Sequence, residues 1–306
     1  MTILNFFRPR PTREGAALPD FLAGYSIEVM PRTAANIDDF RDVLPAGTRV
    51  YIAHIEGTPI EDMVACAKRV RDEGFRPMPH VPARWIDGRD TLEDWLRRYA
   101  EESGVTEALV LAGGARRAAG GFDSSMALLE TGLFDKHGFT RLHVAGHPEG
   151  SRDIDPDGGT RIVDDAARWK HDFAQRTGAD MALVTQFVFD AAPVISWSER
   201  MRTAGIDLPI HVGVAGPAKL QTLLKFAVAC GIGPSYSVLQ KRARDVSKLV
   251  KPFEPTEVLN DIADYAAKTP DSQIAGAHLF PLGGIRQAAE YANRIAGTAP
   301  AVAARG

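Results

Sequence analysis

Short runs of apolar and β-branched residues alternate with longer segments of helical spacing along almost the whole chain. Strands are expected at residues 25–29, 49–54, 75–81, 108–112, 141–145, 182–186, 209–214 and 274–280, and helices at 35–43, 59–73, 90–103, 124–131, 157–177, 191–204, 218–230 and 284–295. Such alternation predicts parallel strands joined by right-handed crossovers. Eight such strand–helix units in a chain of this length favour one type of α/β fold, a closed (β/α)8 TIM barrel, over an open sheet.

One segment, residues 231–268, interrupts the alternation between the seventh and eighth units. Its two helical stretches, 238–249 and 257–267, flank a proline-containing break, which indicates an insertion in the last connection and not a second domain. The expected organisation is therefore an N-terminal extension (1–20), a single catalytic barrel (21–298) and a flexible tail (299–306).

Composition excludes several classes of protein. The 36 Lys and Arg residues nearly balance the 39 Asp and Glu residues, so the net charge is −3 and no basic field for nucleic acid is expected. No run approaches the ~20 apolar residues that cross a bilayer. Cys66 and Cys230 are the two cysteines, which argues against a disulfide framework and is typical of the reducing cytoplasm.

Polar residues and glycines collect where the expected strands end. Active sites of (β/α)8 barrels lie at the carboxyl ends of the strands, so residues at these positions are expected to share one rim. A single histidine there could equally cap a strand by bonding loop carbonyls, but so many polar positions together predict a site. They are Glu28, His54, His80, Gly113–Gly114, His147, Gln186, the loop 213–216 and His278.

The residue types at these positions argue against three kinds of catalytic site. No His-X-His pair occurs on a strand and no carboxylate ends the late strands, so no metal site is expected. No expected strand contains the lysine of a Schiff-base enzyme. No Gly-X-Ser-X-Gly elbow indicates a serine hydrolase.

Glu28 stands out because it lies within an apolar strand. Burial there is expected to raise the pKa of its carboxyl and keep it a proton donor near neutral pH. The alternative is a structural carboxylate paired with Arg32 or Arg84. Gln186 could read the amide edge of a flat heterocycle, or could bond only to loop backbone. Together with the glycine loops, these residues favour a pocket for a heterocycle or cofactor.

Four sequence blocks carry a resemblance to a known family: Ser26-Ile-Glu-Val-Met-Pro31, Val144-Ala-Gly-His-Pro-Glu-Gly150, Val184-Thr-Gln-Phe-Val-Phe-Asp190 and Pro209-Ile-His-Val-Gly-Val-Ala-Gly-Pro217. In order and spacing the chain resembles methylenetetrahydrofolate reductase from about residue 22 to 296. The resemblance implies an FAD-containing (β/α)8 barrel in one-carbon metabolism and methionine biosynthesis. NADH or NADPH would reduce the flavin, which then reduces 5,10-methylenetetrahydrofolate to 5-methyltetrahydrofolate.

The resemblance also assigns roles to residues. Glu28 would be the general acid that helps open the folate's five-membered ring to a 5-iminium cation. Substrate-binding residues would be Gln186, which contacts the pterin, with Phe187 and His278. Cofactor-binding residues would be His54, His80, Ala112, Gly113, Gly114, Phe122, His147, Asp165, Arg168 and Lys170.

Several positions depart from the family pattern. The family's Leu-Arg-Gly-Asp after the fourth strand is Leu111-Ala-Gly-Gly114 here, so an arginine and an aspartate are missing. These departures leave two alternatives: direct hydride transfer from NAD(P)H without flavin, or a folate- or flavin-binding homologue without turnover. The physiological direction, the choice of nicotinamide nucleotide and the oligomeric state stay open, and a homo-oligomer is compatible with the sequence.

Overall fold

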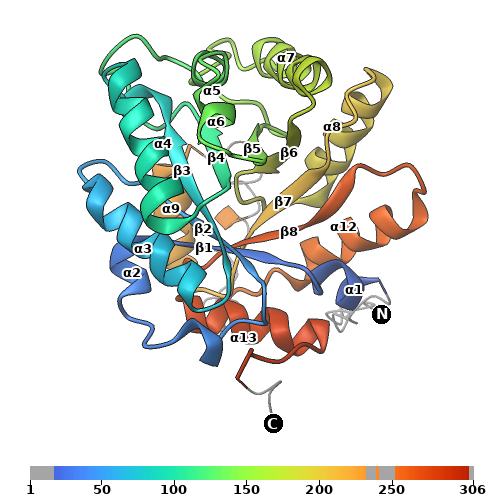
Figure 1. Cartoon of the computed structure of the whole chain (residues 1–306). Helices are drawn as coiled ribbons and strands as arrows, with labels where there is room; N and C mark the ends of the chain where they lie inside the picture. Colours follow the sequence, from blue (N-terminus) through green and yellow to red (C-terminus); the bar gives the residue numbers. More distant parts are fainter. Residues whose placement is uncertain (1–16, 232–238, 241–251, 303–306) are drawn as a thin grey trace, which may run out of the picture.

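The computed structural model describes residues 17–231, 239–240 and 252–302. Eight parallel strands close into a barrel in chain order, with β1 also pairing β8 (Figure 1). The predicted (β/α)8 barrel is confirmed. The strands are β1 (Ser26–Val29), β2 (Arg49–Ile52), β3 (Arg76–Pro82), β4 (Glu107–Leu111), β5 (Arg141–Gly146), β6 (Asp180–Thr185), β7 (Ile210–Ala215) and β8 (Ile274–Phe280).

Helices surround the barrel (Figure 1). In the last of them the buried positions Ile285, Ala288, Ala292 and Ile295 recur at the three- and four-residue spacing of one helix face. The outer helices are α3 (Ile60–Asp72), α4 (Arg89–Ser103), α5 (Ser125–Leu129), α6 (Leu133–Lys136), α7 (Arg161–Thr177), α8 (Ala191–Thr203), α9 (Leu220–Ala229), α12 (Thr256–Lys268) and α13 (Ile285–Ala296).

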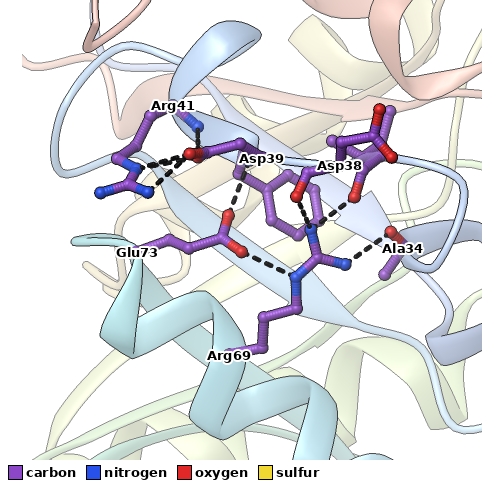
Figure 2. Close-up of polar contacts among 8 residues, drawn as sticks. Ala34, Asp38, Asp39, Arg41, Arg69 and Glu73 are labelled. Carbon is purple, nitrogen blue, oxygen red and sulfur yellow. Dashed lines mark hydrogen bonds and ion pairs between the residues drawn. The ribbon is translucent and has the colours of Figure 1, made fainter.

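The first expected helix, 35–43, is wrong. A short helix α2 (Pro31–Ala34) and a single 3-10 turn η1 (Phe40–Asp42) flank an irregular stretch instead. The Arg69 guanidinium on α3 donates to the carbonyl oxygens of Ala34 and Asp38 (Figure 2) and also to that of Ile37, and these bonds favour the irregular conformation. The Glu73 carboxylate accepts a hydrogen bond from the Phe40 N–H at 2.6 Å, which fastens the stretch to α3.

The helix expected at 157–177 begins four residues later. The buried Asp155 carboxylate accepts from the N–H groups of Ile162 and Val163 at 2.9 and 3.0 Å, so it caps α7 there. Residues 156–160 form the loop that leads to this cap. A second difference is α6, a short helix that follows α5 where the sequence pattern predicted a single helix.

The two ends of the barrel unit are tied down more than the sequence suggested. Helix α1 (Leu18–Leu22) crosses the expected boundary at residues 20 and 21, and both of its leucines are fully buried. In the expected flexible tail, the Ala301 N–H donates to the Leu44 carbonyl at 2.9 Å. Most of the helix expected at 238–249 lies outside the described residues, whereas α12 confirms the one expected at 257–267.

The barrel interior is packed with side chains. Tyr51, Met78, Leu109 and Val184 form an apolar cluster inside it. At the amino-terminal end of the strands, the Arg49 guanidinium and the Glu107 carboxylate form an ion pair of 2.5 Å. The opposite, carboxyl-terminal end therefore holds the residues singled out from the sequence. Over the described ranges, no helix has the length and apolar character needed to cross a membrane.

Candidate active site at the carboxyl ends of the strands

Glu28 lies between two histidines at the mouth of the barrel. One carboxylate oxygen, Oε2, is 3.4 Å from Nε2 of His80 on β3 and 3.8 Å from Nε2 of His278 on β8. The Glu28 side chain is 19% exposed and that of His278 only 1%. The strands therefore bring together three of the residues predicted to form the site, and Glu28 keeps an opening to the exterior.

The expectation of a raised Glu28 pKa is wrong. Burial by itself raises this pKa, but the interactions with His278 and His80 outweigh it and lower the pKa to about 2. Neither Arg32 nor Arg84 is the partner; the Arg84 guanidinium instead pairs with Asp153 at 2.8 Å. Glu28 is thus a carboxylate near neutral pH.

A cavity of about 340 Å³ adjoins this end of the barrel beside β2, β3 and β4. His54 lies in its wall, with its ring stacked on Trp95 at 4.9 Å and its Nε2 donating to the Thr58 carbonyl at 3.0 Å. Burial lowers the pKa of His54, so its ring is favoured in the neutral form. The cavity's two arginines are Arg84 and Arg117. The volume and the aromatic lining suit a flat ligand of small-molecule size.

Gln186 and Phe187 follow β6 but face different surroundings. The Gln186 side chain is exposed, and its Oε1 accepts from the Phe187 N–H at 3.0 Å. Phe187 is 1% exposed, with its ring against those of Phe189 and Phe280 at 5.7 and 5.3 Å. Gln186 is therefore accessible to a ligand, whereas Phe187 supports the rim from beneath.

We expect Gly213→Ala to destabilise this part of the rim. A Cβ at Gly213 would lie 2.4 Å from the Thr185 carbonyl oxygen and 2.8 Å from the Gln186 backbone, which cannot yield without moving β6. The expected loss in the free energy of unfolding is about 1–3 kcal/mol, measured by urea denaturation. Gly24→Ala is the control because its Cβ would meet no atom within 4 Å. Equal effects of the two changes would contradict the packing argument.

The backbone after β4 has only some of the features that would let a ligand approach it closely. Gly113 has φ +89°, a conformation that favours glycine, and a Cβ there would lie 3.0 Å from that of Pro82. The Ala112 carbonyl accepts from the Arg84 N–H at 2.8 Å, and a Cβ at Gly114 would meet nothing within 4 Å. Phe122 packs against the main core. His147 follows β5, and burial lowers its pKa to about 4.

The three residues of α7 implied for a flavin's ribose and phosphates do not share one surface. Asp165 is exposed and pairs with Arg161 at 3.4 Å. Arg168 donates to the Ala204 carbonyl at 2.9 Å. Lys170 is buried and donates to the Ala145 carbonyl at 2.8 Å, and burial lowers its pKa to about 8. The residues present therefore fit FAD in part: His80, His147 and Gly113 suit a ring system, whereas Asp165 and Arg168 are engaged elsewhere.

Sequence reasoning missed a group of polar residues inside the barrel. Tyr51, His143 and His211 lie on β2, β5 and β7, and the Tyr51 hydroxyl is 2.5 Å from Nδ1 of His143. His143 in turn stacks on His211 at 4.9 Å. The signal was available, because side chains alternate along a strand and these residues fall on its inward positions. Among the residues the structure describes, no group of three or more His, Cys, Asp or Glu side chains is arranged to hold a metal ion.

No protein-family model matches the chain. One solved structure with a similar fold is an uncharacterized protein from Clostridium thermocellum that binds two copies of 5-methyl-5,6,7,8-tetrahydrofolic acid. It matches this chain with a TM-score of 0.54 and 13% sequence identity. The match covers 90% of this chain and 96% of that one. A second, the carboxyl transferase domain of Rhizobium etli pyruvate carboxylase with 3-bromopyruvate, has a TM-score of 0.36 at 10% identity, covering 89% and 54%. The second score is too low to carry an argument, and at this identity the first shows a shared barrel fold.

Proposed function

We propose that this protein reduces 5,10-methylenetetrahydrofolate to 5-methyltetrahydrofolate, with hydride drawn from NADH or NADPH. The observation that carries the proposal is the Glu28 carboxylate held between His80 and His278 at the barrel mouth, at 3.4 and 3.8 Å. The four sequence blocks that resemble methylenetetrahydrofolate reductase include Glu28 and Gln186.

The structural comparison adds independent support. The barrel of the Clostridium thermocellum protein covers nearly all of this chain, and that protein binds a methylated tetrahydrofolate. A folate ligand is also chemically suited to the mouth described above. The exposed Gln186 amide offers N–H donors to a pterin edge, and the cavity beside β2, β3 and β4, at the same end of the barrel, has aromatic walls.

In the proposed reaction the protein supplies orientation and one proton. Opening the five-membered ring of the folate requires a proton on its departing nitrogen. The Glu28–His80–His278 group can deliver that proton because a proton on either Nε2 lies next to Glu28 Oε2, the group nearest the opening. The carboxylate then remains opposite the cationic iminium and stabilises it by charge.

FAD is the hydride carrier that we propose, since it would accept hydride from the nicotinamide nucleotide and pass it to the folate. What supports it is the placement of His80, Gly113 and His147 at the ends of three neighbouring strands, β3, β4 and β5. A second candidate is direct transfer from the nicotinamide nucleotide without flavin. It is favoured by one observation: Asp165 pairs with Arg161, and Arg168 with the Ala204 carbonyl.

Purified protein is expected to show the visible absorption bands of flavin, or to acquire them with added FAD. Under anaerobic conditions NADH or NADPH should bleach these bands, and methylenetetrahydrofolate should restore them with formation of 5-methyltetrahydrofolate. Turnover without bands or FAD uptake would establish the direct route instead. Absence of turnover by either route would overturn the proposed function, and 5-methyltetrahydrofolate binding without turnover would indicate a folate-binding homologue.

A further inference from the structure

A continuous series of polar side chains leads from Glu28 into the barrel. Beyond the Glu28 contact, the other ring nitrogen of His278, Nδ1, is 2.9 Å from the Ser26 hydroxyl. All of this lies in the interior, since Ser26 is 3% exposed and His278 1%. His278 therefore connects the mouth with a second hydrogen-bonding group behind it.

The series continues across the barrel through Tyr51. Its ring lies 4.2 Å from that of His278, and its hydroxyl interacts with both Ser26 and His143. The contact with Nδ1 of His143 spans strands β2 and β5, which are not neighbours in the sheet, so it crosses the interior. Tyr51 and His143 have no exposed surface.

His143 and His211 form the inner end of the series. Their rings stack at 4.9 Å, and Nε2 of His143 has no hydrogen-bond partner among the described side chains and backbone. A buried nitrogen of this kind is a typical position for an internal water. His211 is half-buried, so it lies closer to solvent than His143 does.

The charges around this inner end favour neutral imidazoles. Arg49 on β2 and Arg141 on β5 face His143 and His211 together, and each histidine also faces the other or His278. Burial and these cations lower the pKa of both rings, to about 4 for His211. Both arginines are themselves paired, Arg49 with Glu107 and Arg141 with Asp180. A neutral imidazole has one donor and one acceptor nitrogen and can pass a proton onward.

We propose that His278, Ser26, Tyr51 and His143 form a proton relay that reprotonates Glu28 from inside the barrel. The proposal rests on the reductase function, which consumes one proton per turnover. Folate and hydride donor bound at the mouth would exclude water from Glu28. The interior series gives the carboxylate a second route to protons that the ligands do not cover.

Each step of the relay moves one proton between neighbouring groups, and the last one requires His278 Nε2 and Glu28 Oε2, 3.8 Å apart, to close to hydrogen-bond distance. A water delivers a proton to Nε2 of His143, whose Nδ1 proton passes to the Tyr51 oxygen. The Tyr51 hydroxyl proton passes to Ser26, and the Ser26 hydroxyl proton to Nδ1 of His278. Finally the Nε2 proton of His278 passes to Glu28 Oε2. The water that gives up its proton becomes hydroxide and is restored by a proton from the solvent; one proton arrives on Glu28, and no electrons are exchanged.

The relay can be tested without turnover by ¹⁵N NMR of the histidine side chains in the full chain. Glu28→Gln at the mouth is expected to change the proton occupancy of Nδ1 and Nε2 in His143. In a Tyr51→Phe background the same change should leave His143 unaffected, because the hydroxyl link is gone. Ser26→Ala is a second break, and Met78→Leu, a buried neighbour of Tyr51 in the barrel, is the packing control.

Turnover supplies the second measurement. Tyr51→Phe is expected to lower kcat about 10-fold with KM nearly unchanged, and small weak acids in the buffer should restore the rate. Met78→Leu should show neither effect. A His143 response that persists in both Tyr51→Phe and Ser26→Ala, or no response to Glu28→Gln in the parent chain, would overturn the relay. If the parent chain has no folate turnover, the proposed function fails, while the NMR result still decides the relay.

Discussion

Glu28→Gln is expected to lower the rate of methylenetetrahydrofolate turnover at least ~100-fold while 5-methyltetrahydrofolate still binds. Glutamine has nearly the same shape and can occupy the same place beside the two histidines. It cannot take up and release the proton, and it carries no charge to stabilise the iminium cation. The measurements are steady-state kinetics for turnover and calorimetry for ligand binding.

A matched control is Glu93→Gln, which removes one carboxylate charge from an outer-surface pair with Lys136. It should leave turnover within about twofold, since surface pairs of this kind contribute little. Turnover that survives Glu28→Gln would remove Glu28 from the chemistry. Loss of binding together with turnover would indicate that Glu28 mainly holds the ligand.

Acidification is expected to destabilise the fold steeply between pH 6.5 and about 4. Burial lowers the pKa of His147 and His211 from 6.5 to about 4, and that of His143 well below 6.5. Because the unfolded chain binds these protons more readily, the stability is fully present above pH 6.5 and is lost as the pH falls. For His147 and His211 a difference of this size corresponds to about 3 kcal/mol each.

Urea denaturation at pH 7.5, 6, 5 and 4.5 measures this slope, which should approach about 1.4 kcal/mol per pH unit for each proton taken up. His211→Gln should reduce the slope of unfolding free energy against pH by the contribution of one proton. The control is Leu109→Met, which changes the packing of the barrel interior without removing a titrating group. The low pKa of Glu28 adds a further loss only below its ordinary value of 4.5. A stability that stays constant from pH 6.5 to 4.5 would contradict the burial of neutral histidines.

The fold was readable from the sequence because its signals are local. Strand and helix periods depend on the next few residues, so all eight strands were located within about two residues. The errors arose where a side chain bonds to the backbone. Arg69, more than 30 residues away in the chain, donates to the carbonyls of Ala34 and Asp38 and holds residues 35–39 outside a helix. Asp155, seven residues before Ile162, sets where α7 begins.

The position of Glu28 near the end of a strand could be predicted from the sequence, together with the rule that active sites of (β/α)8 barrels lie at the carboxyl ends of the strands. Its ionisation did not, because a pKa depends on which charges and hydrogen bonds lie within a few ångströms. Only closure of the barrel brings His80 and His278, far away in the chain, to within 4 Å of one carboxylate oxygen. The same closure turns Tyr51 and His143, unremarkable within their own strands, into direct partners across the interior. The sequence thus determined the scaffold and its rim, and tertiary structure decided where the protons reside.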